Sequence, residues 1–156
     1  MNKLLSIITT LLVFAGLTGC SALTGEEIAR LAINQVSTDD NNLIIKETSL
    51  SLKKGDEIAF WSEMDMKYEG DVTLQFQIEV LKDGENLGIL EIDTTEKNIT
   101  LGELKTSIMG KTDWSFTGKN SEFKIEDDGN YTFKGILVAT KNPTLIINKA
   151  EIVLKI

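Results

Sequence analysis

Apolar and polar residues alternate with a period of two over most of the chain after position 42. The alternation is nearly unbroken between residues 71 and 81, where one face carries Leu74, Phe76, Ile78 and Val80 and the other carries Thr73, Gln75, Gln77 and Glu79. A strand with this pattern buries one side and leaves the other in water. We therefore expect Phe76 in the core and Gln77 at the surface.

The same period predicts further strands, separated by glycines that recur at the spacing of antiparallel strands joined by turns. They span residues 43–52, 56–64, 87–92, 99–109, 114–117, 122–125, 131–140 and 144–156. The only proline, Pro143, marks a turn between the last two. Because a single segment looks helical, parallel βαβ winding is excluded. The predicted fold is all-β, an antiparallel β-sandwich with a jelly-roll or immunoglobulin-like arrangement favoured over a barrel.

The helical segment covers residues 23–36 and precedes the sandwich. Thr24 can cap it with Glu27 as the capping-box partner, and an apolar stripe follows at the 3.6-residue period, made by Ile28, Leu31, Ala32 and Val36. We expect a short amphipathic helix that packs on its own domain or belongs to a tether. A helix at the membrane surface or against a partner is the alternative. Residues 37–42 are polar and predict a loop.

The first 20 residues have the features of an export signal. Lys3 precedes an almost wholly apolar run over residues 4–17, which is shorter than the roughly 20 residues of a membrane-spanning helix. The run ends in Leu17-Thr18-Gly19-Cys20, with Thr18 where Ser or Ala is commoner. These four residues resemble the lipobox of bacterial lipoproteins. No family is identified for the rest of the chain.

The lipobox resemblance implies that Cys20 takes a diacylglycerol, that the signal peptide 1–19 is removed, and that the new amine can take a further acyl chain. Two or three acyl chains anchor a protein stably in a membrane. Ser21, in place of Asp, goes with sorting to the outer membrane rather than the inner one. The alternatives are an ordinary secretory signal or an uncleaved anchor. The expected organisation is the signal at 1–19, the lipidated cysteine with helix and tether at 20–42, and the sandwich at 43–156.

Composition excludes several kinds of chemistry. Without the signal, 15 basic and 24 acidic side chains remain, which disfavours nucleic acid as a partner. Histidine is absent and the only cysteine is destined for lipid. Catalytic triads with His, Cys-His pairs, zinc sites built from His or Cys, and thiol redox chemistry are therefore excluded. Carboxylate chemistry, a Ser-Lys arrangement and a calcium site built from oxygen ligands remain open.

The acidic segment Glu126-Asp127-Asp128-Gly129-Asn130 clusters oxygen ligands around a glycine, which suggests calcium. It lacks the spaced pattern of an EF-hand loop, and Asp-Gly and Gly-Asn are ordinary turn residues. We interpret it as a turn. No metal and no cofactor is expected.

The stretch around Trp61 is the best sequence candidate for recognition, because it mixes acids with large aromatics. Alternation puts Ile58, Phe60 and Met64 on one face and Ala59, Trp61 and Glu63 on the other, with Tyr68 nearby. An exposed Trp61 would offer a flat apolar surface to a sugar or a protein. The alternative is that the N-terminal helix or a second sheet covers this face. Core positions are expected for the aromatics Trp114, Phe116, Tyr131 and Phe133.

These observations favour a noncatalytic binding or assembly module, anchored in the cell envelope through the lipid on Cys20, with an envelope protein or glycan as its partner. A carboxylate-dependent hydrolase of envelope glycans is the alternative enzyme. A structural or inhibitor-like lipoprotein without a small-molecule site is a third possibility.

Overall fold

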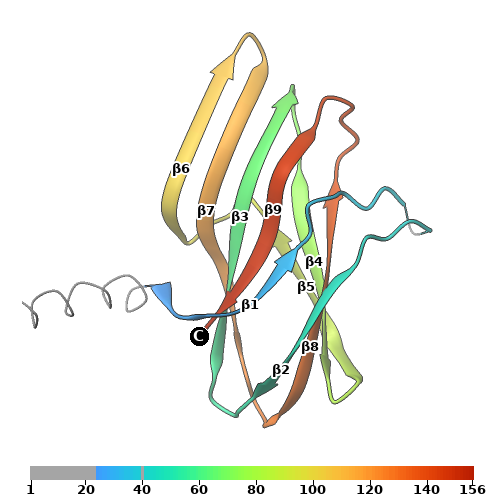
Figure 1. Ribbon diagram of the computed structural model, residues 1–156, viewed down its shortest axis with the longest axis vertical. Coiled ribbons are helices and arrows are strands. Elements are labelled where there is room, and N and C mark those ends of the chain that lie inside the picture. The colour runs from blue at the N-terminus through green and yellow to red at the C-terminus, as the bar shows by residue number, and fades with distance from the viewer. Residues whose placement is uncertain (1–23, 40) are drawn as a thin grey trace, which may run out of the picture.

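The computed structural model describes residues 24–39 and 41–156, and this part of the chain is almost entirely β-strand (Figure 1). Every strand pairs antiparallel with its neighbours. Over the described residues, no helix has the length and apolar character needed to span a membrane. The strands are β1 (Glu27–Ala32), β2 (Lys46–Leu52), β3 (Glu57–Glu69), β4 (Leu74–Lys82), β5 (Glu85–Asp93), β6 (Ile99–Ile108), β7 (Lys111–Lys124), β8 (Gly129–Ala139) and β9 (Ile146–Lys155).

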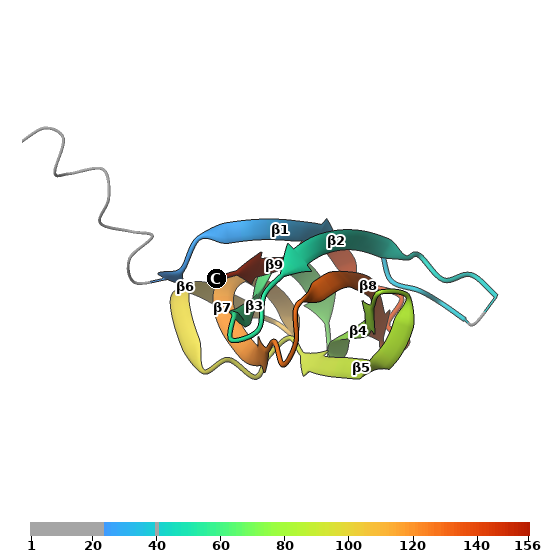
Figure 2. The same cartoon turned by 90° about the horizontal axis from the view of Figure 1, so that it is seen from below.

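The strands form two packed sheets, one with the order β1-β9-β3-β7-β6 and the other with the order β2-β8-β4-β5. Each step along one sheet is matched by a step along the other. In the first sheet β1, β9, β3 and β7 are successive neighbours, and in the second sheet their counterparts are β2, β8, β4 and β5. This arrangement is a jelly roll, to which β6 adds a strand at the β7 edge. The antiparallel sandwich is therefore confirmed, and its topology is the jelly roll. β1 and β2 close one margin, and β5 and β6 lie at the opposite margin (Figure 2).

The core lies between the sheets and follows the predicted alternation. Phe76 is fully buried while Gln77 is partly exposed. The four aromatics expected in the core, Trp114, Phe116, Tyr131 and Phe133, are all buried. Phe60 and Phe133 meet edge to face across the two sheets, with ring centroids 5.8 Å apart. The faces assigned to these strands from the sequence are therefore confirmed.

The helix expected at residues 23–36 is wrong over most of that span, because residues 27–32 form β1. β1 pairs with β9, and Leu31 and Ile33 point inward and are buried. An isolated helix of this length is marginal in water, whereas the strand satisfies its backbone on β9 and buries the period-two set Ala29, Leu31 and Ile33. The sandwich therefore begins with β1 rather than at residue 43. Residues 37–42 do form a loop, within which residue 40 lies outside the described part.

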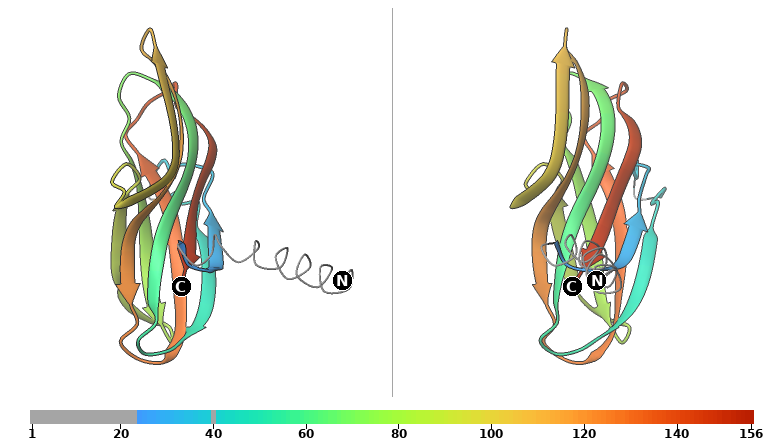
Figure 3. Two further views of the ribbon diagram at one scale, coloured as in Figure 1. Left: turned by 90° about the vertical axis from the view of Figure 1, so that its left-hand side faces the viewer. Right: turned by 60° about the vertical axis from the view of Figure 1, so that its left-hand side comes forward.

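The β6–β7 hairpin projects beyond the other strands at one end of the molecule (Figures 1 and 3). Met109 and Gly110 make its two-residue turn with φ angles of 52° and 81°, as a type I′ hairpin turn requires. The segments 114–117 and 122–125, expected as separate strands, belong to one strand, β7, apart from Ile125 just beyond its end. A bulge at Asn120 leaves this residue unpaired opposite β3, between Ser121 and Lys119.

The start of the described chain is tied to its end. Glu26 and Ile156 exchange two backbone hydrogen bonds, of 2.9 and 3.0 Å. Gly25 has a φ of 77°, and a Cβ at this position would lie 2.8 Å from the Ile156 carbonyl oxygen. This close approach needs glycine. The first described residues therefore lie beside the C-terminus, at some distance from the β6–β7 turn (Figure 1).

Candidate functional site

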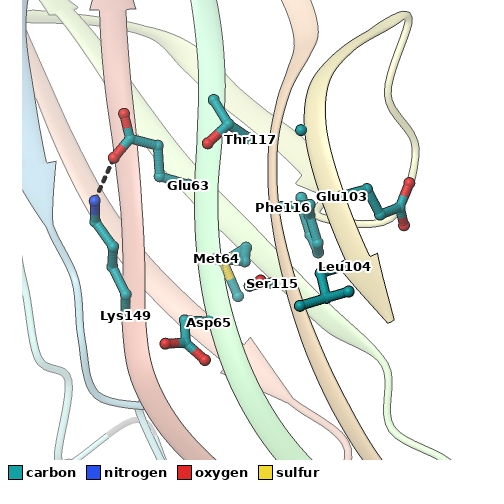
Figure 4. A pocket seen from close by; sticks show the side chains of 10 residues that line it. Glu63, Met64, Asp65, Glu103, Leu104, Ser115, Phe116, Thr117 and Lys149 are labelled. Carbon is teal, nitrogen blue, oxygen red and sulfur yellow. Dashed lines mark hydrogen bonds and ion pairs between the residues drawn. The ribbon is translucent and has the colours of Figure 1, made fainter. Parts of the chain in front are cut away.

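A shallow groove of about 450 Å³ lies on the outer face of the five-stranded sheet, across β9, β3, β7 and β6 (Figure 4). Ser115 and Thr117 of β7 line its floor with short hydroxyl side chains. Glu63 and Asp65 of β3 and Lys149 of β9 stand on one side, and Leu104 of β6 stands on the other. Because these side chains project from paired strands, their positions are fixed by the sheet.

The polar side of the groove is an ion-pair network centred on Arg30 of β1, the only arginine of the chain. Its guanidinium donates to Glu63 at 2.8 Å and to Glu151 at 2.5 Å, and it also pairs with Glu27 at 2.8 Å. Lys149 pairs with Glu63 from the other side. Glu63 is thus held between two cations.

This network acts mainly on Glu63, whose side chain is 20 % exposed. The hydrogen bonds from Arg30, with a smaller contribution from Lys149, lower the pKa of its carboxyl from 4.5 to about 2 against the opposing effect of burial. The three carboxylates raise the pKa of the Arg30 guanidinium. Glu63 is therefore ionised at any physiological pH and has no proton to give.

Asp65 and the hydroxyls are the groups with free hydrogen-bonding capacity. Asp65 accepts one hydrogen bond, of 3.2 Å, from the Asn148 amide. Glycoside hydrolysis needs a protonated carboxylic acid beside a second carboxylate, which the ionised Glu63 does not supply. A Ser-Lys pair would need a free lysine amine, but the Lys149 ammonium is engaged by Glu63 and lies 3.8 Å from Glu151. Neither group therefore has the protonation state that these two reactions require of an acid or a free amine.

Trp61 lies on the same outer face as Glu63, as the alternation predicts, but it is only 2 % exposed. Its neighbours across the sheet are Val153 and Lys119, and the Lys155 ammonium lies 4.7 Å from the ring centroid. The indole Nε1 is buried without a hydrogen-bond partner. The expected open tryptophan surface is therefore absent. Among the described residues, the Lys155 side chain of the same face lies over the ring.

Tyr68 is separated from the other two predicted residues. It points to the inner face of β3, is 9 % exposed, and lines a different hollow beside the β6–β7 turn with Ile108 and Ile146. The structure thus brings Trp61 and Glu63 onto one face and leaves Tyr68 on the other. Glu63 is the one predicted residue that lines the groove.

Sequence reasoning missed Arg30, Lys149 and Leu104, which come from three other strands. Arg30 was assigned to a helix, so its reach across β9 to β3 was not foreseen. The one feature of the sequence that distinguishes Arg30 is that it is the only arginine among 16 basic residues. Of the acidic segment, residues 126–128 lie in the connection between β7 and β8, and Gly129 and Asn130 begin β8. Asp128 accepts a 2.8 Å hydrogen bond from the backbone of Lys54.

Comparison with known proteins adds little to this description. No protein-family model and no curated protein matches the chain. Among solved structures, a novel β-glucosidase from Paenibacillus barengoltzii aligns with a TM-score of 0.32 and 14 % sequence identity. The alignment covers 80 % of this chain and 10 % of that enzyme's chain. A similarity this low carries no inference about fold or activity.

Proposed function

We propose that the protein is a lipoprotein of the bacterial cell envelope, anchored by acyl chains on Cys20 and sorted to the outer membrane, whose jelly-roll domain is a noncatalytic binding module. The lipobox Leu17-Thr18-Gly19-Cys20 supports the anchor. The observation that carries the binding role is the groove beside Glu63. It combines a fixed row of hydrogen-bonding side chains with an acid that cannot act as a proton donor.

The anchor would hold the domain close to the membrane. Three residues, at positions 21–23, separate Cys20 from Thr24, where the described chain begins. Four Cα steps span at most about 14 Å. The end of the sandwich that carries the C-terminus would then lie next to the lipid, while the β6–β7 hairpin and the groove stand further along the molecule.

The partner that best fits this surface is a protein. An exposed aromatic ring would offer a flat apolar face to a sugar, but in the described residues every tryptophan, tyrosine and phenylalanine is buried except Phe123, which is half-buried. The exposed apolar side chains near the groove are aliphatic, with Leu104 on its border. A segment of extended polypeptide could place its polar groups on Ser115, Thr117 and Asp65.

Site-specific photo-crosslinking in intact cells tests this proposal. A photoreactive amino acid at Thr117, in the groove, is compared with one at Gln77, which lies on the outer face of the opposite sheet. We expect a discrete protein adduct from position 117, none from position 77, and loss of the adduct when Asp65→Ala is added. Equal adducts from both positions, or none from position 117, would overturn the assignment of the groove.

The hydrolase alternative has one observation in its favour, the placement of Glu63 and Asp65 two residues apart on the same face of β3. Release of reducing ends from envelope glycans by the purified protein, abolished by Asp65→Asn, would support an enzyme. We expect no such release, because the charges around Glu63 lower its pKa.

A further inference from the structure

Strand β6 is a free sheet edge with unusual properties. It ends the five-stranded sheet, and all ten of its residues are exposed. Its exposed apolar side chains are Ile99, Leu101, Leu104 and Ile108, and Met109 follows at the turn with 97 % exposure. An open edge offers unpaired backbone N–H and C=O groups, and natural proteins usually protect such edges with charge, proline or a covering element.

The other free edges carry such protection. β5, which ends the four-stranded sheet, bears the three acids Glu85, Glu91 and Asp93, so two copies of it would repel each other. β1 is short, contains a bulge, and lies beside β2 at the closed margin. β6 has one acid and one base, Glu103 and Lys105, and both turn inward around Trp114: Glu103 accepts a 2.7 Å hydrogen bond from the indole and Lys105 lies 3.9 Å from the ring centroid.

We propose that β6 pairs antiparallel with β6 of a second copy, joining the two five-stranded sheets into one continuous sheet. The positions of the two charges select the register. Suppose that Leu104 lies opposite Leu104 of the second copy. Glu103 of each copy then lies opposite Lys105 of the other, which gives two ion pairs, and Thr106 lies opposite Gly102. A register centred on Glu103 or Lys105 would place like charges opposite each other, which destabilises a strand pair.

This register also fits the local geometry of the strand. The bulge between Thr100 and Gly102 leaves residues 102–108 regular, and the symmetric core of the proposed pair, residues 102–106, lies within that stretch. Leu104 is 70 % exposed on the outer face, and it would be covered by its own counterpart. The two grooves would then lie on the same face of the joined sheet. The inference depends neither on the lipid anchor nor on the ligand of the groove.

Disulfide trapping of the full-length protein in detergent tests both the partner and the register. Residues directly opposite each other in an antiparallel pair have Cα atoms about 4.5 or 5.5 Å apart, and both separations lie within the range of a disulfide. We expect Leu104→Cys to form a dimer under mild oxidation. Thr106→Cys and Gly102→Cys should each give no disulfide-linked dimer alone but should cross-link when the two variants are mixed. Gly102 tolerates the change because a Cβ there meets nothing within 4 Å.

The controls separate this contact from chance collision. Unmodified protein reports any cross-linking through Cys20, and Ile89→Cys places a similarly exposed thiol on the β5 edge. Native mass measurement should show a dimer that Leu104→Lys converts to a folded monomer, with the circular dichroism spectrum of the unmodified protein retained. The proposal is overturned if the protein is monomeric at 100 μM or above. It is also overturned if Ile89→Cys cross-links as well as Leu104→Cys, or if Leu104→Cys captures only other proteins in membranes.

Discussion

Arg30 on β1 donates a 2.8 Å hydrogen bond to Glu63 on β3, across the intervening strand β9. This contact spans three strands of the sheet with a single pair of side chains. It makes one wall of the groove and also fixes the charge of Glu63. The same ion pair therefore contributes to the stability of the sheet and to the charge of the proposed binding groove.

We predict that Glu63→Gln lowers the free energy of unfolding by about 2 kcal/mol at pH 7, a figure discounted for the partial exposure of the pair. The folded pKa of Glu63 is about 2, compared with an ordinary value of 4.5. Its contribution is therefore complete above about pH 4.5 and declines as the pH falls toward 2. Urea unfolding of both proteins between pH 2 and 7 should show the difference shrinking to nothing. A difference that stays constant with pH would refute the ion-pair origin, and the exposed Glu126→Gln serves as the matched control.

Trp61→Ala should cost about 3–5 kcal/mol of stability, as truncation of a buried aromatic does. The reason is its near-complete burial on the outer face, under Lys155. Thermal or urea unfolding measures the effect. A near-neutral substitution would mean that Trp61 is open in solution, and it would restore this residue as a candidate recognition surface.

Asn120 should prove one of the most sensitive polar positions. Its side-chain oxygen accepts from both the backbone N–H and the hydroxyl of the buried Ser62, at 3.0 and 2.8 Å, and its amide donates to the Glu96 carbonyl at 2.7 Å. Asn120→Ala leaves Ser62 without its acceptor, so we expect a loss of about 2–3 kcal/mol. Asn98→Ala, which removes one exposed hydrogen bond to the Asn120 carbonyl, should cost less than about 1 kcal/mol. Equal losses in urea unfolding would contradict the proposed role of Asn120.

The face assignment of β4 is tested by Phe76→Ala and Gln77→Ala. We expect the first to cost about 3–5 kcal/mol and the second to be near neutral, because Phe76 is buried between the sheets and Gln77 lies on the outer face. Comparable losses at the two positions would contradict the register of this strand.

The sandwich itself could be predicted because its strands alternate apolar and polar residues, and successive side chains of a strand point to opposite faces, as at Phe76 and Gln77. β1 could not be assigned in this way, because its apolar residues fit both a helical and a strand period. Only the open edge of β9, more than a hundred residues away, selects the strand. Long-range pairing commonly overrides local propensity in this manner.

The groove could be predicted only in part, for a related reason. The aromatic neighbours of Glu63 make it a candidate in the sequence, yet its charge depends on Arg30 and Lys149. These two residues lie near Glu63 only because β1 and β9 pair beside β3 in the sheet. The Trp61 side chain is buried beside β9, which places Val153 opposite it and Lys155 over its ring. Sequence spacing does not encode these contacts between distant strands.

Intact-mass analysis of the protein extracted from bacterial membranes tests the central claim most directly. The account predicts a polypeptide that begins at Cys20 and carries a diacylglyceryl group, with or without a further acyl chain on its amine. Cys20→Ser should leave the precursor uncleaved and unmodified. A wild-type mass that shows unmodified Cys20, or a chain that begins elsewhere, would contradict the lipoprotein assignment.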